Sequence, residues 1–184
     1  MRVSPTSLPD VLLIEPTVFG DARGFFLESW NRRAFAEAGI DVDFVQDNHS
    51  RSRLGVVRGL HYQIEHAQGK LVRVTEGAVF DVAVDLRRAS PTFGRHVALE
   101  LSAANRKMLF IPPGFAHGFM VVSDAAEFLY KTTDYWYPEH ERTLLWNDAA
   151  LAIAWPSGIS PTLAPKDAAG TPFATAECYE QAVQ

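Results

Sequence analysis

Three stretches place ionisable or hydrogen-bonding side chains inside apolar runs that read as strands. The first, residues 56–63, carries Arg58 and His61. Strict alternation puts side chains three apart on opposite faces, but Gly59 between them allows a bulge that turns one of them around. Histidine is the side chain most often used as a general base, so His61 is a candidate base. The alternative is a packed histidine at the edge of the core beside a surface arginine.

The second stretch, residues 111–119, has a Pro-Gly turn that places His117 at the start of the next strand. An exposed turn histidine is the simpler interpretation. The third, residues 127–133, puts Tyr130 on the same face as two other inward residues. Its ring either packs in the core with its hydroxyl bonded or serves as a phenolic proton donor in a pocket.

Polar and aromatic residues elsewhere have weaker signals. Three consecutive aromatic residues at 135–137 are more than a strand end requires. They predict either stacking on a flat ring such as a nucleobase or an interface patch. The turn at 21–24 leads into a strand with Phe26 and Glu28 on one face. The polar runs at 46–51 and 164–167 indicate loops.

A metal site is the next possibility, because the Pro-x-Gly-x-x-His turn at 112–117 looks like half of a cupin metal motif. The other half requires His-x-His and a glutamate, where this chain has His61-Tyr62-Gln63 and then Lys70. A protonated lysine has no lone pair for a metal, and two histidines fall short of the three protein ligands usual for catalytic zinc. We therefore expect a cupin-like barrel without a metal; a metal-dependent cupin is the alternative.

Short strands must position these residues. Residues 79–86 alternate regularly, and further strands are predicted over 97–101, 108–112, 118–122 and 127–133. Residues 70–74 and 78–85, joined through Glu76-Gly77, predict a hairpin. Residues 31–38 predict about two helical turns, capped by Asn31 and ended by Gly39. Many short strands favour a sandwich or barrel, whose interior can receive inward polar side chains.

Composition narrows the class of protein. The chain has 184 residues, which predicts one domain over 1–184. Its net charge of −5 argues against a main role in binding nucleic acid. The single cysteine, Cys178, cannot form an internal disulfide. The first sixteen residues hold only a short apolar run broken by prolines and acids, so we expect no signal peptide, no membrane span and a cytoplasmic location.

The motifs, taken in order over nearly the whole chain, resemble the dTDP-4-dehydrorhamnose 3,5-epimerase family, a metal-free branch of the cupins. The matching stretches are 10–16, 19–26, 44–50, 58–61, 68–72, 80–85, 90–94, 111–119, 127–130 and 166–168. The resemblance implies a mainly β fold, a cupin-like antiparallel β jelly-roll barrel with a few short helices. It also implies an isomerase that needs no cofactor, in keeping with the lack of any Gly-rich dinucleotide or phosphate-binding motif.

The implied reaction inverts C3 and C5 of dTDP-4-keto-6-deoxyglucose, giving dTDP-4-keto-L-rhamnose. The family pattern makes His61 the base, Asp167 its carboxylate partner and Tyr130 the proton donor on the opposite face. Lys70 matches a cation near the C4 oxygen. The chemistry holds together, because a hydrogen next to a ketone is acidic only when fixed positive charge, here from Lys70 and Arg58, stabilises the enolate.

The resemblance also implies the substrate contacts. Arg58 and His117 line the pocket, and Trp136 stands where many relatives have a tyrosine that stacks on thymine. Further nucleotide-sugar contacts match Gln46, Asp47, Asn48, Glu141 and Lys166. The neighbouring subunit would supply Arg23, Phe26 and Glu28, because family dimers exchange N-terminal strands; this implies a homodimer.

Three alternatives stay open. The same scaffold can invert C3 alone in a related deoxysugar pathway, or move the keto group, and the geometry of Tyr130 decides between one and two inversions. A sugar-binding cupin without catalysis would have no need of His61, Tyr130 and Asp167 together. The third alternative is the metal-dependent cupin.

Overall fold

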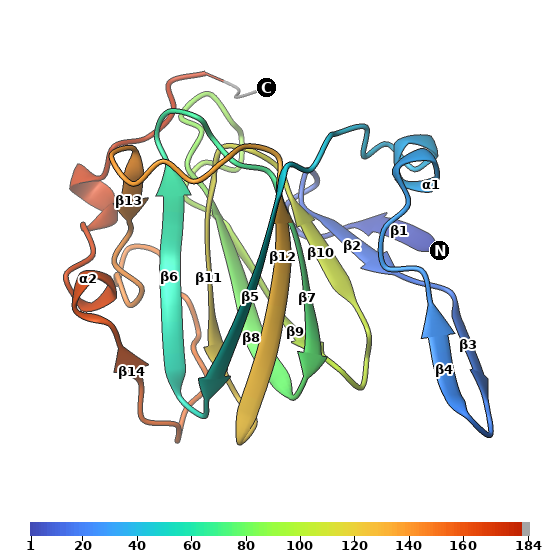
Figure 1. The fold of residues 1–184 in the computed structure, drawn as a ribbon. Coiled ribbons are helices and arrows are strands. Elements are labelled where there is room, and N and C mark those ends of the chain that lie inside the picture. The colour runs from blue at the N-terminus through green and yellow to red at the C-terminus, as the bar shows by residue number, and fades with distance from the viewer. Residues whose placement is uncertain (182–184) are drawn as a thin grey trace.

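Two β-sheets face each other and hold the hydrophobic core between them (Figure 1). The computed structural model describes residues 1–181. The first sheet runs in the order β1 (Arg2–Pro5), β2 (Leu12–Glu15), β10 (Met108–Ile111), β7 (Lys70–Glu76), β12 (Ala125–Thr132) and β5 (Gln46–Arg53). The second contains β13 (Glu141–Thr143), β6 (Val56–Gln63), β11 (Phe115–Val121), β8 (Ala78–Asp85) and β9 (His96–Ser102). All these pairings are antiparallel; the short β14 (Thr162–Leu163) lies parallel to β6.

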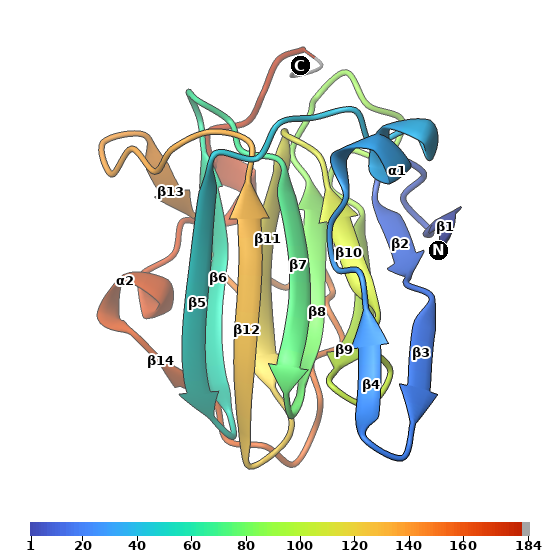
Figure 2. The ribbon, with the colours of Figure 1, turned by 45° about the vertical axis from the view of Figure 1, so that its right-hand side comes forward.

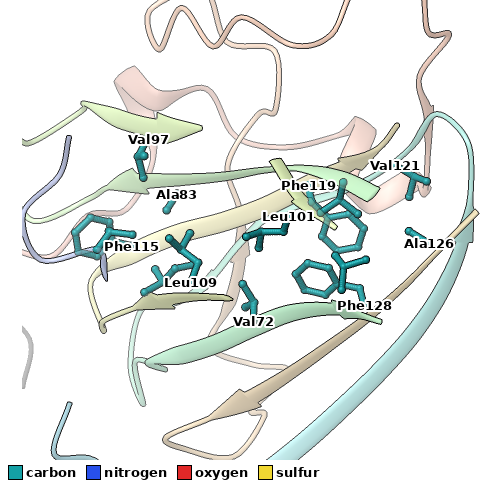
Figure 3. Packing of buried hydrophobic residues seen from close by; sticks show 14 of the residues in the cluster. Val72, Ala83, Val97, Leu101, Leu109, Phe115, Phe119, Val121, Ala126 and Phe128 are labelled. Atoms are coloured by element: carbon teal, nitrogen blue, oxygen red, sulfur yellow. The ribbon is translucent and has the colours of Figure 1, made fainter. Parts of the chain in front are cut away.

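The core is built from the inward faces of both sheets. Figure 3 shows Val72 and Phe128 of the first sheet packed against residues of the second such as Phe119. The rings of Phe119 and Phe128 are stacked with their centroids 4.2 Å apart. Because these positions come from strands with the predicted alternation, the sequence pattern and the packing agree.

The outer face of the second sheet is buried as well. Val82 and Val84 of β8 pack in a second cluster with Leu151 and Tyr179 from the C-terminal segment. Both faces of the predicted strand at 79–86 are therefore covered. This leaves Asp81 on the inward face with no exposed surface, at a position that alternation had grouped with apolar residues.

The predicted hairpin of residues 70–74 and 78–85 is wrong. β7 pairs with β10 and β12 in the first sheet, whereas β8 pairs with β9 and β11 in the second. Gly77, with a φ of 71°, takes the chain from one sheet to the other. A Cβ at this position would lie 1.9 Å from the carbonyl oxygen of Ala125, so the crossing requires glycine. The two apolar strands thus belong to different sheets, and both contribute side chains to the core between them.

Helices are few and short. The predicted helix is α1 (Arg32–Glu37), with Asn31 accepting a bond from the backbone N–H of Ala34. A four-residue helix, α2 (Pro165–Ala168), occupies the C-terminal stretch where the sequence indicated a loop, and a 3₁₀ turn covers Phe173–Thr175. In the described part of the chain, no helix is long and apolar enough to cross a membrane.

A β-hairpin arm extends away from the two sheets (Figures 1 and 2). It consists of β3 (Val18–Asp21) and β4 (Gly24–Leu27), joined by the predicted turn. Three phenylalanines of this arm, Phe19, Phe25 and Phe26, are 64%, 59% and 69% exposed. So much exposed aromatic surface on a projecting hairpin is typical of an interaction site.

Candidate active site

A cavity of about 360 Å³ opens between the two sheets. Strands β5, β7 and β12 line it from the first sheet, and β6 and β11 from the second. Most of the residues predicted from the sequence meet here: Gln46, Asn48, Arg58, His61, Lys70, His117, Tyr130, Trp136, Glu141, Lys166 and Asp167. Residues scattered over more than a hundred positions of the chain therefore share one pocket.

His61 and Asp167 form a hydrogen-bonded pair, although 106 residues separate them. The distance between His61 Nε2 and Asp167 Oδ1 is 2.5 Å, and the Asp167 side chain is only 3% exposed. The pairing of β14 with the start of β6 brings α2 beside β6, which places Asp167 against His61. A buried carboxylate in this position orients the ring and stabilises an imidazolium. Asp167 bonds Nε2, so this ring nitrogen is not available to a substrate.

The bulge that Gly59 allows is present, and Arg58 and His61 both line the cavity. On β11, His117 lies opposite His61 and Phe119 opposite Arg58, so β6 has one more residue than its partner there. Gly59 has a φ of 114°, and a Cβ on it would lie 2.7 Å from the carbonyl oxygen of His117. Glycine is thus required for both side chains to face the same space.

Lys70 and Tyr130 approach from the opposite sheet. Burial lowers the pKa of Lys70 to about 8, against the opposing effect of Glu141 and Asp81. Its Nζ donates to the main-chain oxygen of His61 at 3.3 Å. Burial is also the main cause that raises the pKa of Tyr130, with Glu141 adding to it. Tyr130 therefore keeps its proton at neutral pH.

A second histidine–carboxylate pair lies deeper in the cavity wall. His117 Nε2 is 3.0 Å and 3.1 Å from the two carboxylate oxygens of Asp81. Asp81 is fully buried, and the sequence reasoning did not select it. The available signal was an acidic residue on an inward, otherwise apolar face of a strand. Further lining residues were also missed, among them Ser50, Gln63 and Gln68.

Four predicted substrate contacts do not line this cavity within one chain. Arg23 and Phe26 lie on the projecting arm, where Arg23 pairs with Asp21 at 2.5 Å. Glu28 accepts a bond from the side chain of Asn31 at 3.1 Å. Asp47 points outward from β5 and pairs with Lys131 at 2.8 Å, because alternation turns inward only its neighbours on either side.

The mouth of the cavity has an aromatic residue on one side and an ion pair on the other. Trp136 is 55% exposed there. Lys166 Nζ lies 2.9 Å from Glu141 Oε2. Among residues 1–181, no group of three or more His, Cys, Asp and Glu side chains is arranged to hold a metal; the metal-free character stays a prediction from the sequence.

Comparison with known proteins gives matches over nearly the full length. A family model described as dTDP-4-dehydrorhamnose 3,5-epimerase matches residues 5–175. The dTDP-4-dehydrorhamnose 3,5-epimerase of Pseudomonas aeruginosa is 63% identical over 180 residues, which cover 97% of this chain and 99% of that protein.

Solved structures show the same likeness. The crystal structure of dTDP-6-deoxy-D-glucose-3,5-epimerase from Legionella pneumophila, in complex with dTDP-4-keto-L-rhamnose, has a TM-score of 0.96 at 47% identity and covers 99% of both chains. The crystal structure of dTDP-4-dehydrorhamnose 3,5-epimerase from Bacillus anthracis, with TDP and pyrophosphate bound, has a TM-score of 0.88 at 46% identity. That match covers 91% of this chain and 96% of the other.

Proposed function

Because the chain belongs to the dTDP-4-dehydrorhamnose 3,5-epimerase family, we propose that the cavity between its sheets is the place where the sugar is inverted. The protein is an isomerase with dTDP-4-dehydrorhamnose 3,5-epimerase activity, and its mainly β, cupin-like fold is confirmed. One observation carries the assignment of roles: His61 and Tyr130 belong to opposite sheets and line the same cavity. A base on one side of a sugar ring can remove a hydrogen, and an acid on the other side can add one to the opposite face, which inverts the carbon.

Each inversion then takes two proton transfers. His61 Nδ1 removes the hydrogen from the carbon next to the C4 ketone, and the electron pair of the broken C–H bond moves onto O4. Lys70 and Arg58 stabilise the resulting enolate. Tyr130 delivers a proton to the carbon from the other face. Each positioned acid or base contributes about 10²–10⁴-fold.

Solvent resets the two residues after each inversion. Tyr130 recovers a proton from water, and His61 releases the proton that it took. One solvent-derived hydrogen therefore enters the sugar at every inverted carbon. The buried partner Asp167 keeps His61 in the orientation needed for the next cycle.

Residues at the mouth fit the nucleotide part of the substrate. The exposed indole of Trp136 offers a face for the base, and Lys166 offers positive charge for the diphosphate. Within the described chain, the buried Asn48 Nδ2 has no hydrogen-bond partner. A buried donor without a partner is costly, so a ligand oxygen is its natural acceptor. We propose dTDP-4-keto-6-deoxyglucose as the ligand that fills this cavity.

The first test follows the fate of solvent hydrogen. With dTDP-4-keto-6-deoxyglucose in deuterated water, we expect the enzyme to introduce deuterium at both C3 and C5, as measured by NMR of the product. Label at C3 alone would instead identify the C3-only epimerase. Binding of the nucleotide sugar with no label at either carbon would contradict the proposal and favour a sugar-binding module.

The projecting arm is proposed to complete the cavity of a second subunit in a homodimer. Arg23 lies in the turn of the arm and Phe26 on β4, and neither residue lines the cavity of its own chain. The arm itself projects away from the two sheets (Figure 1). Glu28 lies at the base of the arm, just beyond β4. The exposed phenyl groups of the arm are the apolar surface that such an association would bury.

Mixing two inactive variants tests this exchange. We expect Arg23→Ala and His61→Asn each to be impaired alone and to regain activity when unfolded together and refolded. In a mixed dimer, the Arg23→Ala chain keeps His61 and receives Arg23 from its partner, so one of its two sites is intact. Random pairing then restores about a quarter of all sites. No recovery in dimers of confirmed size would show that the arm serves its own chain. The cytoplasmic location and the single domain remain predictions.

A further inference from the structure

The segment at residues 134–137 belongs to no strand, and its exposed Trp136 lines the cavity at the mouth. Gln63, which is 3% exposed, forms hydrogen bonds with the backbone of this segment on both sides of Trp136. Gln63 Nε2 donates to the carbonyl oxygen of Tyr135 at 3.2 Å, and Gln63 Oε1 accepts from the N–H of Tyr137 at 2.7 Å. One buried amide thus fixes the peptide groups before and after the exposed indole.

The same amide ties this segment to the neighbouring loop. Gln63 Nε2 also donates to the carbonyl oxygen of His66 at 2.7 Å. The rings of His66 and Tyr137 stack with centroids 4.1 Å apart. The loops that follow β6 and β12 are therefore joined at the mouth, with Gln63 beneath them.

Two further glutamines bond the segment, Gln46 from the start of β5 and Gln68 from the loop before β7. Gln46 Oε1 accepts from the N–H of Trp136 at 3.1 Å, and Gln68 Nε2 donates to the carbonyl oxygen of Asp134 at 2.9 Å. Side-chain amides therefore satisfy the backbone N–H and C=O groups of this segment, as a neighbouring strand does in a sheet. The position of Trp136 therefore depends on these glutamines, because replacing one of them removes its bonds to the segment.

We propose that Gln63 is a positioning residue that holds Trp136 in place for stacking on the base of the nucleotide. This inference rests on the proposed function of Trp136. An unbonded segment would have to be ordered each time a ligand binds, which weakens binding. The nucleobase takes no part in proton transfer. Loss of Gln63 is therefore expected to raise the dissociation constant and KM and to leave kcat unchanged.

A double-mutant cycle tests the proposal with dTDP as the probe. Gln63→Met keeps the length and packing of the side chain and removes its hydrogen bonds. We expect Gln63→Met and Trp136→Ala each to raise the dissociation constant of dTDP about tenfold in calorimetry. The double variant should be no weaker than Trp136→Ala alone, because Gln63 acts through the indole. With substrate at saturation, kcat should stay within about twofold of the wild type.

Asn105→Ala is the matched control. Asn105 also makes three side-chain bonds to the backbone, to residues 100, 102 and 107, in a turn outside the cavity. Its loss should lower thermal stability and leave the dissociation constant of dTDP unchanged. If Asn105→Ala weakens dTDP binding as much as Gln63→Met does, general destabilisation explains the effect and the proposal fails.

The other outcomes separate the possible failures. Additive effects of Gln63→Met and Trp136→Ala, or a fall in kcat with KM unchanged, would overturn the positioning role while the proposed function stands. Unchanged dTDP binding in Trp136→Ala would overturn the stacking role and this inference with it. Should Gln63→Met fail to fold, Gln68→Met removes a single bond and should show the same non-additivity with a loss of about threefold.

Discussion

His61→Ala is expected to abolish the incorporation of solvent deuterium while binding of the nucleotide sugar persists. The base is the group that breaks the C–H bond, so its loss should lower exchange by about 10³-fold or more. The residues proposed to hold the nucleotide lie at the mouth of the cavity and are unchanged. Exchange is measured by NMR in deuterated water, and binding by calorimetry with dTDP. Unchanged exchange would refute the role of His61.

Two companion variants sharpen that result. His61→Ala leaves the buried Asp167 without its partner, which is costly to the fold. His61→Gln places an amide N–H near the position of Nε2, so it retains a donor for that carboxylate and should be equally inactive. Tyr130→Phe keeps the base and removes the acid. It should still exchange hydrogen at the carbon attacked by His61, but the deuterium should return from the same face, without inversion.

Lys70→Met is expected to remove most of the activity and to stabilise the fold at neutral pH. The lysine provides the nearest buried positive charge for the enolate, and loss of such a group costs about 10²–10³-fold in kcat. Burial holds its pKa at about 8 instead of 10.5, so the folded protein disfavours the charged form. Methionine has a similar length and no charge to desolvate.

The sign of the pH dependence follows from linkage. Between about pH 8 and 10.5 the unfolded chain binds more protons at this residue than the folded chain, so the wild type gains stability as the pH rises through that window. The advantage of Lys70→Met should therefore be greatest at pH 7, up to about 3 kcal/mol, and vanish above about pH 10.

Urea denaturation at the two pH values measures this difference. Lys107→Met, the same change in a turn outside the cavity, should alter the free energy of unfolding by less than about 0.5 kcal/mol at either pH. A Lys70→Met protein that is less stable than the wild type at pH 7 would show that the ammonium group is well solvated or paired. The predicted shift in its pKa would then be wrong.

Local features of the fold were predictable because they depend on neighbours in the chain. The alternation over 79–86 and the capped helix after Asn31 are of this kind. So is the bulge at Gly59, where only glycine permits the backbone. The hairpin of 70–85 was predicted wrongly, since two apolar strands with a short connection look alike whether they pair edge to edge or face each other across a core.

The candidate site divides in the same way. The sequence by itself determined the family and most of the residues that line the cavity, because these follow from the types and order of its motifs. The family pattern already paired Asp167 with His61, and only the tertiary structure decided that Asp81 bonds His117 and that Gln63 bonds the segment at the mouth. It also decided how strongly Lys70 is desolvated. Burial and long-range contacts depend on which sheet each strand joins, and no local pattern of side chains specifies that choice.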